Sequence, residues 1–220
     1  MKFSKETLAL LSNFASINQN LAMLTGNQLD SVSTERNIRV SAKIAENIPS
    51  DFYIYDLSTF LNILSLVPDA ECEFSEEGAT IVDGKRKIKY MSADKSILAL
   101  PASPQLPKTT TYEEFDISEG TLASLRKAAT VLSAPNIQIT GDGEVITASV
   151  IDLKNPLPNT FQVEIGTTTK TFNADFQVST FKMLTGDYNV VLDSNYVSKW
   201  SLQGKDYIMF IAMVQSSKFD

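Results

Sequence analysis

The sequence predicts an α+β protein of two similar domains, each with helices packed on antiparallel sheet, and internal echoes are the main reason. TLALL at 7–11 returns as TLASL at 121–125, and LSTF at 57–60 returns as VSTF at 178–181. Both pairs fall on segments with helical periodicity, in the same order and at similar spacing. A proline-rich stretch lies between the copies. Together these observations indicate a duplicated domain.

Four segments have the apolar periodicity of amphipathic helices. In the third of them, Leu122, Leu125 and Ala129 recur at three- and four-residue steps, so one face is apolar. Ser118 precedes this run and can cap the helix, and a serine stands in the same place before the first helix. Pro68 ends the second helix. The predicted helices are 4–17, 56–67, 118–132 and 178–184.

Strands are predicted where apolar and polar residues alternate, as they do in IRVSAKI at 38–44. Asp83-Gly84 is a hairpin signal between two of these strands. In the first half we expect strand structure at 21–45, with a turn at 25–27, and then at 51–55, 71–74, 80–82 and 85–91. In the second half the expected strands are 112–117, 137–139, 144–152, 161–165, 172–177, 188–192, 197–202 and 206–214.

The connector between the halves has its own composition. PASPQLPKTTT at 101–111 contains three of the eight prolines and has no periodic apolar pattern. This composition is typical of an extended and fairly stiff linker. We therefore place the first domain at 1–107, with the connector beginning near residue 101, and the second domain at 108–220.

Composition restricts the partners and the compartment. The chain carries 19 Lys and Arg against 26 Asp and Glu, a net charge of −7. An acidic chain does not coat nucleic acid, so any contact with DNA needs its basic groups gathered in one place. The single cysteine, Cys72, fits a reducing compartment. No apolar run has the length of a membrane span, and Glu6 interrupts the N-terminus too early for a signal peptide. We expect a cytoplasmic protein with no membrane partner.

Catalytic chemistry finds little support. The chain has no histidine, which removes the commonest general base and the commonest metal ligand. The carboxylate pairs Glu76-Glu77 and Glu113-Glu114 are adjacent in sequence, so on a strand their side chains point to opposite faces. There is no glycine-rich phosphate loop followed by lysine. We expect no enzyme, no catalytic residue, no metal site and no cofactor.

Three blocks carry a resemblance to a known family. MKFSKETLALLSNFASIN at the N-terminus, YDLSTFLNILSLVPDAE at 55–71 and FKMLTGDY at 181–188 resemble the DNA sliding clamps of T-even-type bacteriophages. The resemblance implies a closed ring of three identical subunits, each with two like-folded domains. Helices would line a central hole and sheets would lie outside.

The resemblance also implies a function. The ring would encircle double-stranded DNA without reading its sequence and tether the replicative DNA polymerase in the cytoplasm of an infected bacterial host. An ATP-dependent clamp loader would load it, and a role as late-transcription co-activator would follow for T-even-type phages. The alternative is a phage structural or assembly ring protein with a duplicated β-rich domain and no DNA inside.

The resemblance makes the basic residues of the helices candidates for facing DNA. They are Lys2 and Lys5 in the first helix, Arg126 and Lys127 in the third, and Lys182 in the fourth. Lysine and arginine neutralise phosphate without reading sequence. The alternative is a solvated helix face. The predicted second helix has no basic residue. A further cluster, Lys85, Arg86, Lys87 and Lys89, lies on a predicted hairpin away from the hole and is interpreted as a soluble turn, with a loader or DNA contact as the alternative.

Apolar residues around the connector form the second candidate site. Leu98, Leu100, Leu106 and Tyr112 could border a groove for a partner peptide, because related clamps use the region near the connector in this way. Ordinary packing between domains explains these residues equally well, and the sequence leaves both interpretations open.

Overall fold

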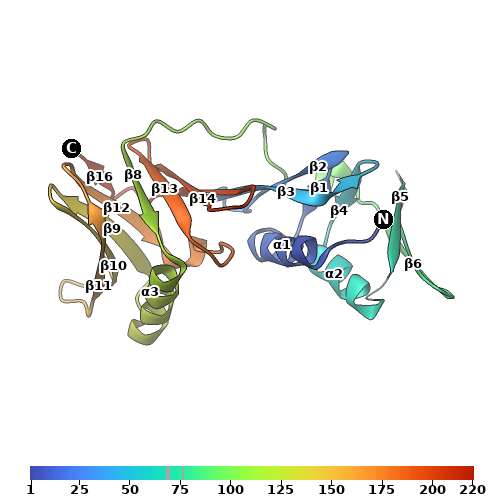
Figure 1. Cartoon of the computed structure of the whole chain (residues 1–220), viewed down its shortest axis with the longest axis horizontal. Coiled ribbons are helices and arrows are strands. Elements are labelled where there is room, and N and C mark those ends of the chain that lie inside the picture. Colours follow the sequence, from blue (N-terminus) through green and yellow to red (C-terminus); the bar gives the residue numbers. More distant parts are fainter. Residues whose placement is uncertain (68–69, 76) are drawn as a thin grey trace. The chain divides into compact units, whose positions relative to one another are not determined.

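In the computed structural model the chain folds as two units, Met1–Leu106 and Pro107–Asp220 (Figure 1). The structure describes residues 1–67, 70–75 and 77–220. Pro68, which we expect to end a helix, and Glu76, a member of one carboxylate pair, lie outside the described residues. Each unit contains helical segments and antiparallel strands.

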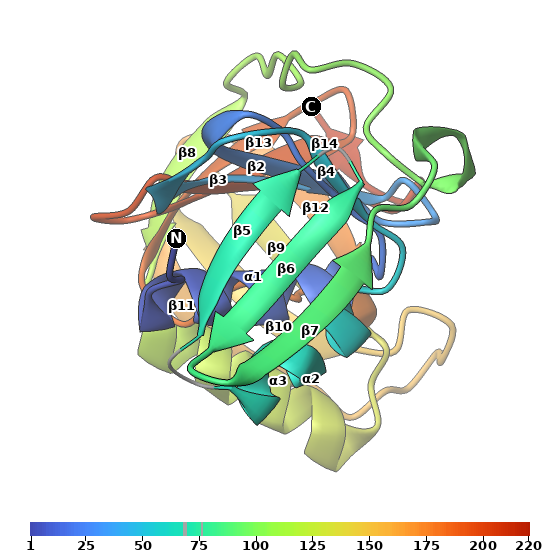
Figure 2. The same cartoon turned by 90° about the vertical axis from the view of Figure 1, so that its right-hand side faces the viewer.

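The first unit alternates helices with strands. Its helices are α1 (Lys5–Ile17), α2 (Leu57–Leu66) and the short 3-10 helix η1 (Lys95–Ile97). Its strands are β1 (Leu21–Met23), β2 (Gly26–Val32), β3 (Ile38–Ile48), β4 (Phe52–Ile54), β5 (Glu71–Ser75), β6 (Gly78–Asp83) and β7 (Arg86–Met91). The antiparallel pairs are β1 with β4, β2 with β3, and β5 with β6 with β7. Figure 2 shows β5, β6 and β7 side by side, with β7 at the edge.

Aromatic packing joins the parts of the first unit. Phe52 and Phe60 are fully buried, and their rings are tilted at a centroid distance of 5.6 Å. Tyr90 from β7 packs edge-on against Phe60 at 5.2 Å, and Phe74 from β5 packs against Phe52 at the same distance. Edge-to-face pairs of this kind add to the burial of the rings. The three-stranded sheet is therefore held to α2 and β4 by one aromatic cluster.

The second unit contains one long helix and more strand. Its helices are α3 (Glu119–Leu132) and the 3-10 turn η2 (Val178–Thr180). Its strands are β8 (Glu113–Ile117), β9 (Asn136–Asp142), β10 (Val145–Ile151), β11 (Phe161–Thr167), β12 (Thr171–Gln177), β13 (Tyr188–Asp193), β14 (Val197–Leu202), β15 (Tyr207–Ala212) and β16 (Lys218–Phe219). They form the sheets β11-β10-β9-β12-β16 and, within this unit, β15-β14-β13-β8. α3 packs on β9, β10 and β11, and the core includes Trp200, which is fully buried.

The predicted fourth helix at 178–184 is wrong, because only the three residues of η2 are helical. Gln177 gives no side-chain cap, and the Thr180 hydroxyl donates to the Gln177 carbonyl at 2.7 Å. The Lys182 amide then donates to the Thr180 carbonyl, two residues back, which ends the helical pattern. Phe181 is buried against Phe176 and Trp200, so tertiary packing determines this segment.

The predicted helices at 4–17 and 118–132 are confirmed, and they begin alike. Ser4 accepts a hydrogen bond from the Thr7 amide at 3.1 Å, and its hydroxyl lies 3.0 Å from the Thr7 hydroxyl. Ser118 and Thr121 repeat this arrangement at 3.1 and 2.9 Å. The same cap at corresponding places is what a duplication predicts. Superposition of residues 1–107 on 108–220 stays a prediction.

Candidate nucleic-acid interface and connector pocket

The first helix presents a mostly neutral polar face. Lys5 is the first residue of α1 and is exposed, whereas Lys2 precedes the helix instead of lying in it. Ser12 and Ser16 are exposed, and their hydroxyls donate to the carbonyls of Leu8 and Asn13. Within α1, Lys5 is therefore the cation available to a passing phosphate.

Glu46 on β3 anchors the first turn of α1. Its carboxylate accepts hydrogen bonds from the Ser4 amide and from the Thr7 hydroxyl, the latter at 2.5 Å. Partial burial raises the pKa of Glu46, but the hydrogen bonds from Thr7 and Ser4 outweigh it, so the pKa lies below its ordinary value. A carboxylate at a helix N-terminus is also favoured by the dipole. Glu46 thus fixes the turn that carries Lys5.

The two basic residues of α3 have different environments. Lys127 is exposed, but Arg126 is half-buried, and its Nε atom is buried with no hydrogen-bond partner among the described residues. Arg126 is four residues after buried Leu122 and three before buried Ala129, so it lies at the margin of the apolar face. Burial raises the pKa of Tyr188, and the charge of Arg126 opposes this rise. Arg126 therefore lies at the edge of the polar face that Lys127 occupies, and its contact with DNA stays a prediction.

The remaining predicted DNA-facing residue is Lys182. It is exposed and follows η2 in a non-helical segment, so it does not lie on a fourth helix as predicted. α2 exposes Ser58, Thr59, Asn62 and Ser65 and carries no basic residue, as predicted. Lys5 and Lys127 are therefore the two members of the predicted set that are exposed on α-helices.

The basic hairpin lies on the three-stranded sheet of the first unit. Arg86, Lys87 and Lys89 are exposed on β7, and Lys85 lies in the turn before it. Ile88 and Tyr90 point to the face opposite Lys87 and Lys89 and are half-buried. In the described part of the chain β7 pairs with β6 alone, so its second edge is open.

A pocket of about 770 Å³ lies in the first unit beside the start of the connector. Leu100 from the predicted groove lines it, whereas Leu98 and Leu106 are half-buried outside its lining. Tyr112 belongs to the second unit, where its ring packs on Phe172 and Phe219. The pocket is lined by Ala22, Leu24, Thr25, Gly26, Asn27, Gln28, Asp30, Lys95, Leu100, Pro101, Ala102, Ser103 and Pro104.

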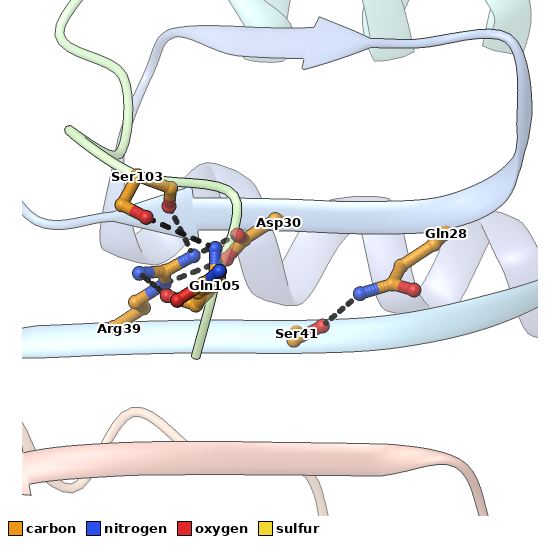
Figure 3. Close-up of polar contacts among 6 residues, drawn as sticks. All are labelled: Gln28, Asp30, Arg39, Ser41, Ser103 and Gln105. Atoms are coloured by element: carbon orange, nitrogen blue, oxygen red, sulfur yellow. Dashed lines mark hydrogen bonds and ion pairs between the residues drawn. The ribbon is translucent and has the colours of Figure 1, made fainter. Parts of the chain in front are cut away.

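Sequence reasoning missed a polar cluster at one end of this pocket (Figure 3). The Arg39 guanidinium pairs with Asp30 and donates to the carbonyls of Ser103 and Gln105, each at 2.8 Å. Burial raises the pKa of Asp30, and the hydrogen bond and charge of Arg39 oppose the rise. The alternation at 38–44 placed Arg39 on the polar face of its strand, but no local signal pointed to a partner more than sixty residues away.

Other chemistry is not evident in residues 1–67, 70–75 and 77–220. No group of three or more His, Cys, Asp and Glu side chains there could hold a metal ion. None of the helices in these ranges is long and apolar enough to cross a membrane. Burial raises the pKa of the Cys72 thiol to about 11.

Comparison with known sequences identifies relatives over most of the chain. The family model described as DNA polymerase processivity factor matches residues 4–100. The sliding clamp of Enterobacteria phage T4 is 31% identical over 199 residues, which cover 87% of each chain. The sliding clamp of Vibrio phage KVP40 is 26% identical over 207 residues, 91% of this chain and 94% of the relative. The match to the clamp of Escherichia phage RB69 is 34% identical over 150 residues and spans 65% of that protein.

Solved structures resemble the chain over nearly its whole length. PCNA of A. fulgidus, bound to the C-terminal region of FEN-1, matches with a TM-score of 0.71 at 14% identity, covering 99% of this chain and 98% of that one. The H. pylori beta clamp in complex with diflunisal matches with a TM-score of 0.70 at 12% identity, covering 94% of this chain and 64% of that one. At these identities the likeness establishes the fold.

Proposed function

This chain belongs to the sliding clamps, the DNA polymerase processivity factors, and from that premise we propose that three copies close into a ring around duplex DNA and tether the replicative polymerase. The family is non-catalytic. The observation that carries the proposal is the relationship to the phage T4 clamp over 87% of each chain. Loading by an ATP-dependent clamp loader, co-activation of late transcription and action in the cytoplasm of an infected bacterium belong to the same proposal. The alternative of a structural phage ring has no comparable support.

Open strand edges support closure of the ring. β7 ends the three-stranded sheet of the first unit, and β11 ends the five-stranded sheet of the second. An exposed edge is a template for pairing with another chain. If β7 of one copy pairs with β11 of the next copy, the interface is heterologous. Such an interface closes into a cyclic ring when the rotation between copies allows it. The exposed side chains on the two edges differ in charge: β7 carries Lys87 and Lys89, and β11 carries Glu164. Opposite charges across neighbouring strands favour this pairing.

The ring has a direct test in the native mass, which we expect to be about three times the 24.2 kDa of one chain. Reversing Lys87 and Lys89 to Glu should shift the mass toward the monomer, because three acidic groups would then face one another. Adding Glu164→Lys to this variant should restore the ring. A monomeric mass for the wild type at micromolar concentration and low salt, or the lack of any rescue, contradicts the edge-to-edge closure.

The contact with DNA rests on Lys5 and Lys127, which are exposed on α1 and α3. Phosphate neutralisation by such residues is independent of sequence and weakens steeply with salt. Sliding needs no tight contact, because topology holds the ring on DNA. Lys5 and Lys127 should therefore contribute to loading of the ring and to its retention on circular DNA.

Charge reversal of both lysines tests this assignment. We expect Lys5→Glu with Lys127→Glu to lower processivity on primed circular DNA, with loader, polymerase and ATP. The loss should be largest at low salt and shrink as salt rises, because salt also weakens the phosphate contacts of the wild type. The matched control reverses Lys108 and Lys154, which are exposed and lie outside helices and strands. Arg126 is left unchanged, because its half-buried position would confound binding with folding. Equal processivity of the two double variants at every salt concentration overturns the assignment.

We also propose that the connector pocket accepts a partner peptide. Apolar side chains of Leu24, Leu100 and Pro101 lie around a space of about 770 Å³, a size suited to a few side chains. Leu24 is 45% exposed, so its side chain is accessible to such a peptide. Leu100→Glu should weaken polymerase binding to the clamp, whereas Leu66→Glu, a change at an exposed leucine on α2, should not. Equal binding by both variants contradicts the pocket assignment.

A further inference from the structure

The start of the connector is held by side chains. Residues 98–112 contain no helix or strand. The amide of Ala99 donates to the Asn20 side chain at 2.9 Å, and the Asn18 side chain donates to the Ala99 carbonyl at 2.7 Å. Asn18 and Asn20 are both buried, so this anchor is fixed from inside the unit. It holds the connector at one end of the pocket.

Arg39 supplies the second anchor. Its Nη2 donates to the Ser103 carbonyl and its Nη1 to the Gln105 carbonyl, each at 2.8 Å, while Nε donates to Asp30 at 3.1 Å (Figure 3). The side chain of Arg39 is 13% exposed and that of Asp30 is 20% exposed. The planar guanidinium can make these contacts together, which a lysine cannot. Asp30 thus orients the Arg39 guanidinium, which holds the connector.

The two anchors enclose the segment that borders the pocket. Residues 100–104 run from the Ala99 anchor to the Arg39 anchor, and all five line the pocket. Asp30 lines it as well, so the ion pair forms part of its wall. Because Pro101 and Pro104 have no amide hydrogen, backbone hydrogen bonds cannot replace the anchors at these positions. The position of this border therefore depends on what holds residues 103 and 105.

We propose that Arg39 is a positioning residue: its guanidinium clasps residues 103–105 to β2 and β3 and so sets the shape of the connector pocket. Opening the clasp releases the connector from residue 101 to residue 106 while the rest of the unit stays folded. The hydrogen bonds at Ala99 stay in place. The pocket therefore loses the border formed by the connector and keeps its lining from β1 and β2. The effect on polymerase binding rests on the proposed function, whereas the effect on the connector does not.

Limited proteolysis of the connector, with hydrogen exchange of the strands, provides the test. Arg39→Gln removes both hydrogen bonds to the connector, and a nonspecific protease should cut the chain between Pro101 and Leu106 about ten- to a hundred-fold faster, as expected for the loss of charge-assisted hydrogen bonds that hold this segment. The amides of β2 and β3 should keep their protection from exchange. Arg36→Gln is the matched control, because Arg36 is exposed in the turn before β3. Equal rates of connector cleavage in the two variants overturn the proposal.

A second variant covers a failure to fold. If Arg39→Gln abolishes the protection of β3, Arg39→Lys decides, since it keeps a cation beside Asp30 but cannot hold both carbonyls. Faster connector cleavage with a protected β3 supports the clasp, and cleavage at the wild-type rate overturns it. Polymerase affinity is measured on the same proteins. A released connector with unchanged affinity leaves the clasp standing and refutes the peptide site, so the two proposals fail separately.

Discussion

Gly141 lies on β9 where the neighbouring strand leaves no space for a side chain. A Cβ atom there would lie 2.4 Å from Phe172 Cε1 and 2.8 Å from the Lys170 carbonyl oxygen. Both distances are far below contact distance, and the second is to backbone. Phe172 is buried and packs on Tyr112 and stacks with Phe219 of the C-terminal strand. Relieving the clash therefore requires the whole aromatic group to move.

The cost of Gly141→Ala follows from this geometry. Overpacking a well-packed core costs about 1–3 kcal/mol, and three atoms within 3 Å of the added Cβ place this substitution at the upper end. We expect about 3 kcal/mol of destabilisation of the second unit. Gly166→Ala is the matched control on β11 of the same sheet, since its Cβ would meet only Ile146 Cδ1, at the ordinary distance of 3.6 Å. It should change the free energy of unfolding by less than about 1 kcal/mol.

The single tryptophan provides the assay. Trp200 is fully buried in the second unit, so its fluorescence during urea denaturation reports the unfolding of that unit. The midpoint for Gly141→Ala should fall well below that of the wild type, with Gly166→Ala close to the wild type. Equal midpoints for the two variants would refute the argument that close approach of Phe172 and Lys170 requires glycine here.

Three further predictions concern helix ends and the aromatic cluster. Ser118→Ala removes the cap of α3 and should destabilise the second unit by about 1 kcal/mol, while Ser124→Ala, at an exposed position within α3, should have little effect on the same fluorescence midpoint. Glu46→Gln should destabilise the first unit at pH 7. Because the pKa of Glu46 is depressed in the folded chain, the advantage of the wild type is present above the ordinary value of 4.5 and is lost as the pH falls through the folded pKa; a difference in unfolding free energy that persists unchanged at pH 3 would contradict the assigned hydrogen bonds. Phe60→Ala should cost about 3–5 kcal/mol, measured by circular dichroism, and a loss below 1 kcal/mol would show that the cluster around Phe52 and Tyr90 does not hold the first unit together.

The sequence predicted what depends on local signals. Residues 5–17 and 119–132 are helical because a capping serine precedes a regular apolar stripe, and both signals lie within a few residues. Residues 178–181 resemble the sequence of α2 at 57–60. However, the Phe181 ring packs into the core, and the helical pattern ends after η2. Propensity is a weak guide when one aromatic residue decides the path.

The candidate sites show the same limit. The sequence places Arg126 among the surface cations. In the structure it is half-buried, because its position on α3 lies at the margin of the apolar face. Arg39 was correctly placed on a polar strand face, but its function depends on carbonyls that carry no sequence signal. Glu46 likewise reaches a helix start about forty residues away. Contacts of this range follow from the fold and not from a motif.

The buried thiol of Cys72 makes the chain suitable for site-specific chemistry. With a pKa of about 11, roughly one molecule in ten thousand carries the reactive thiolate at pH 7. Cys72 of the native protein should therefore react very slowly with maleimides. Val131→Cys on α3, at a position that is 73% exposed, would then react alone. A fluorophore placed there would test, one molecule at a time, the proposed approach of this helix to DNA.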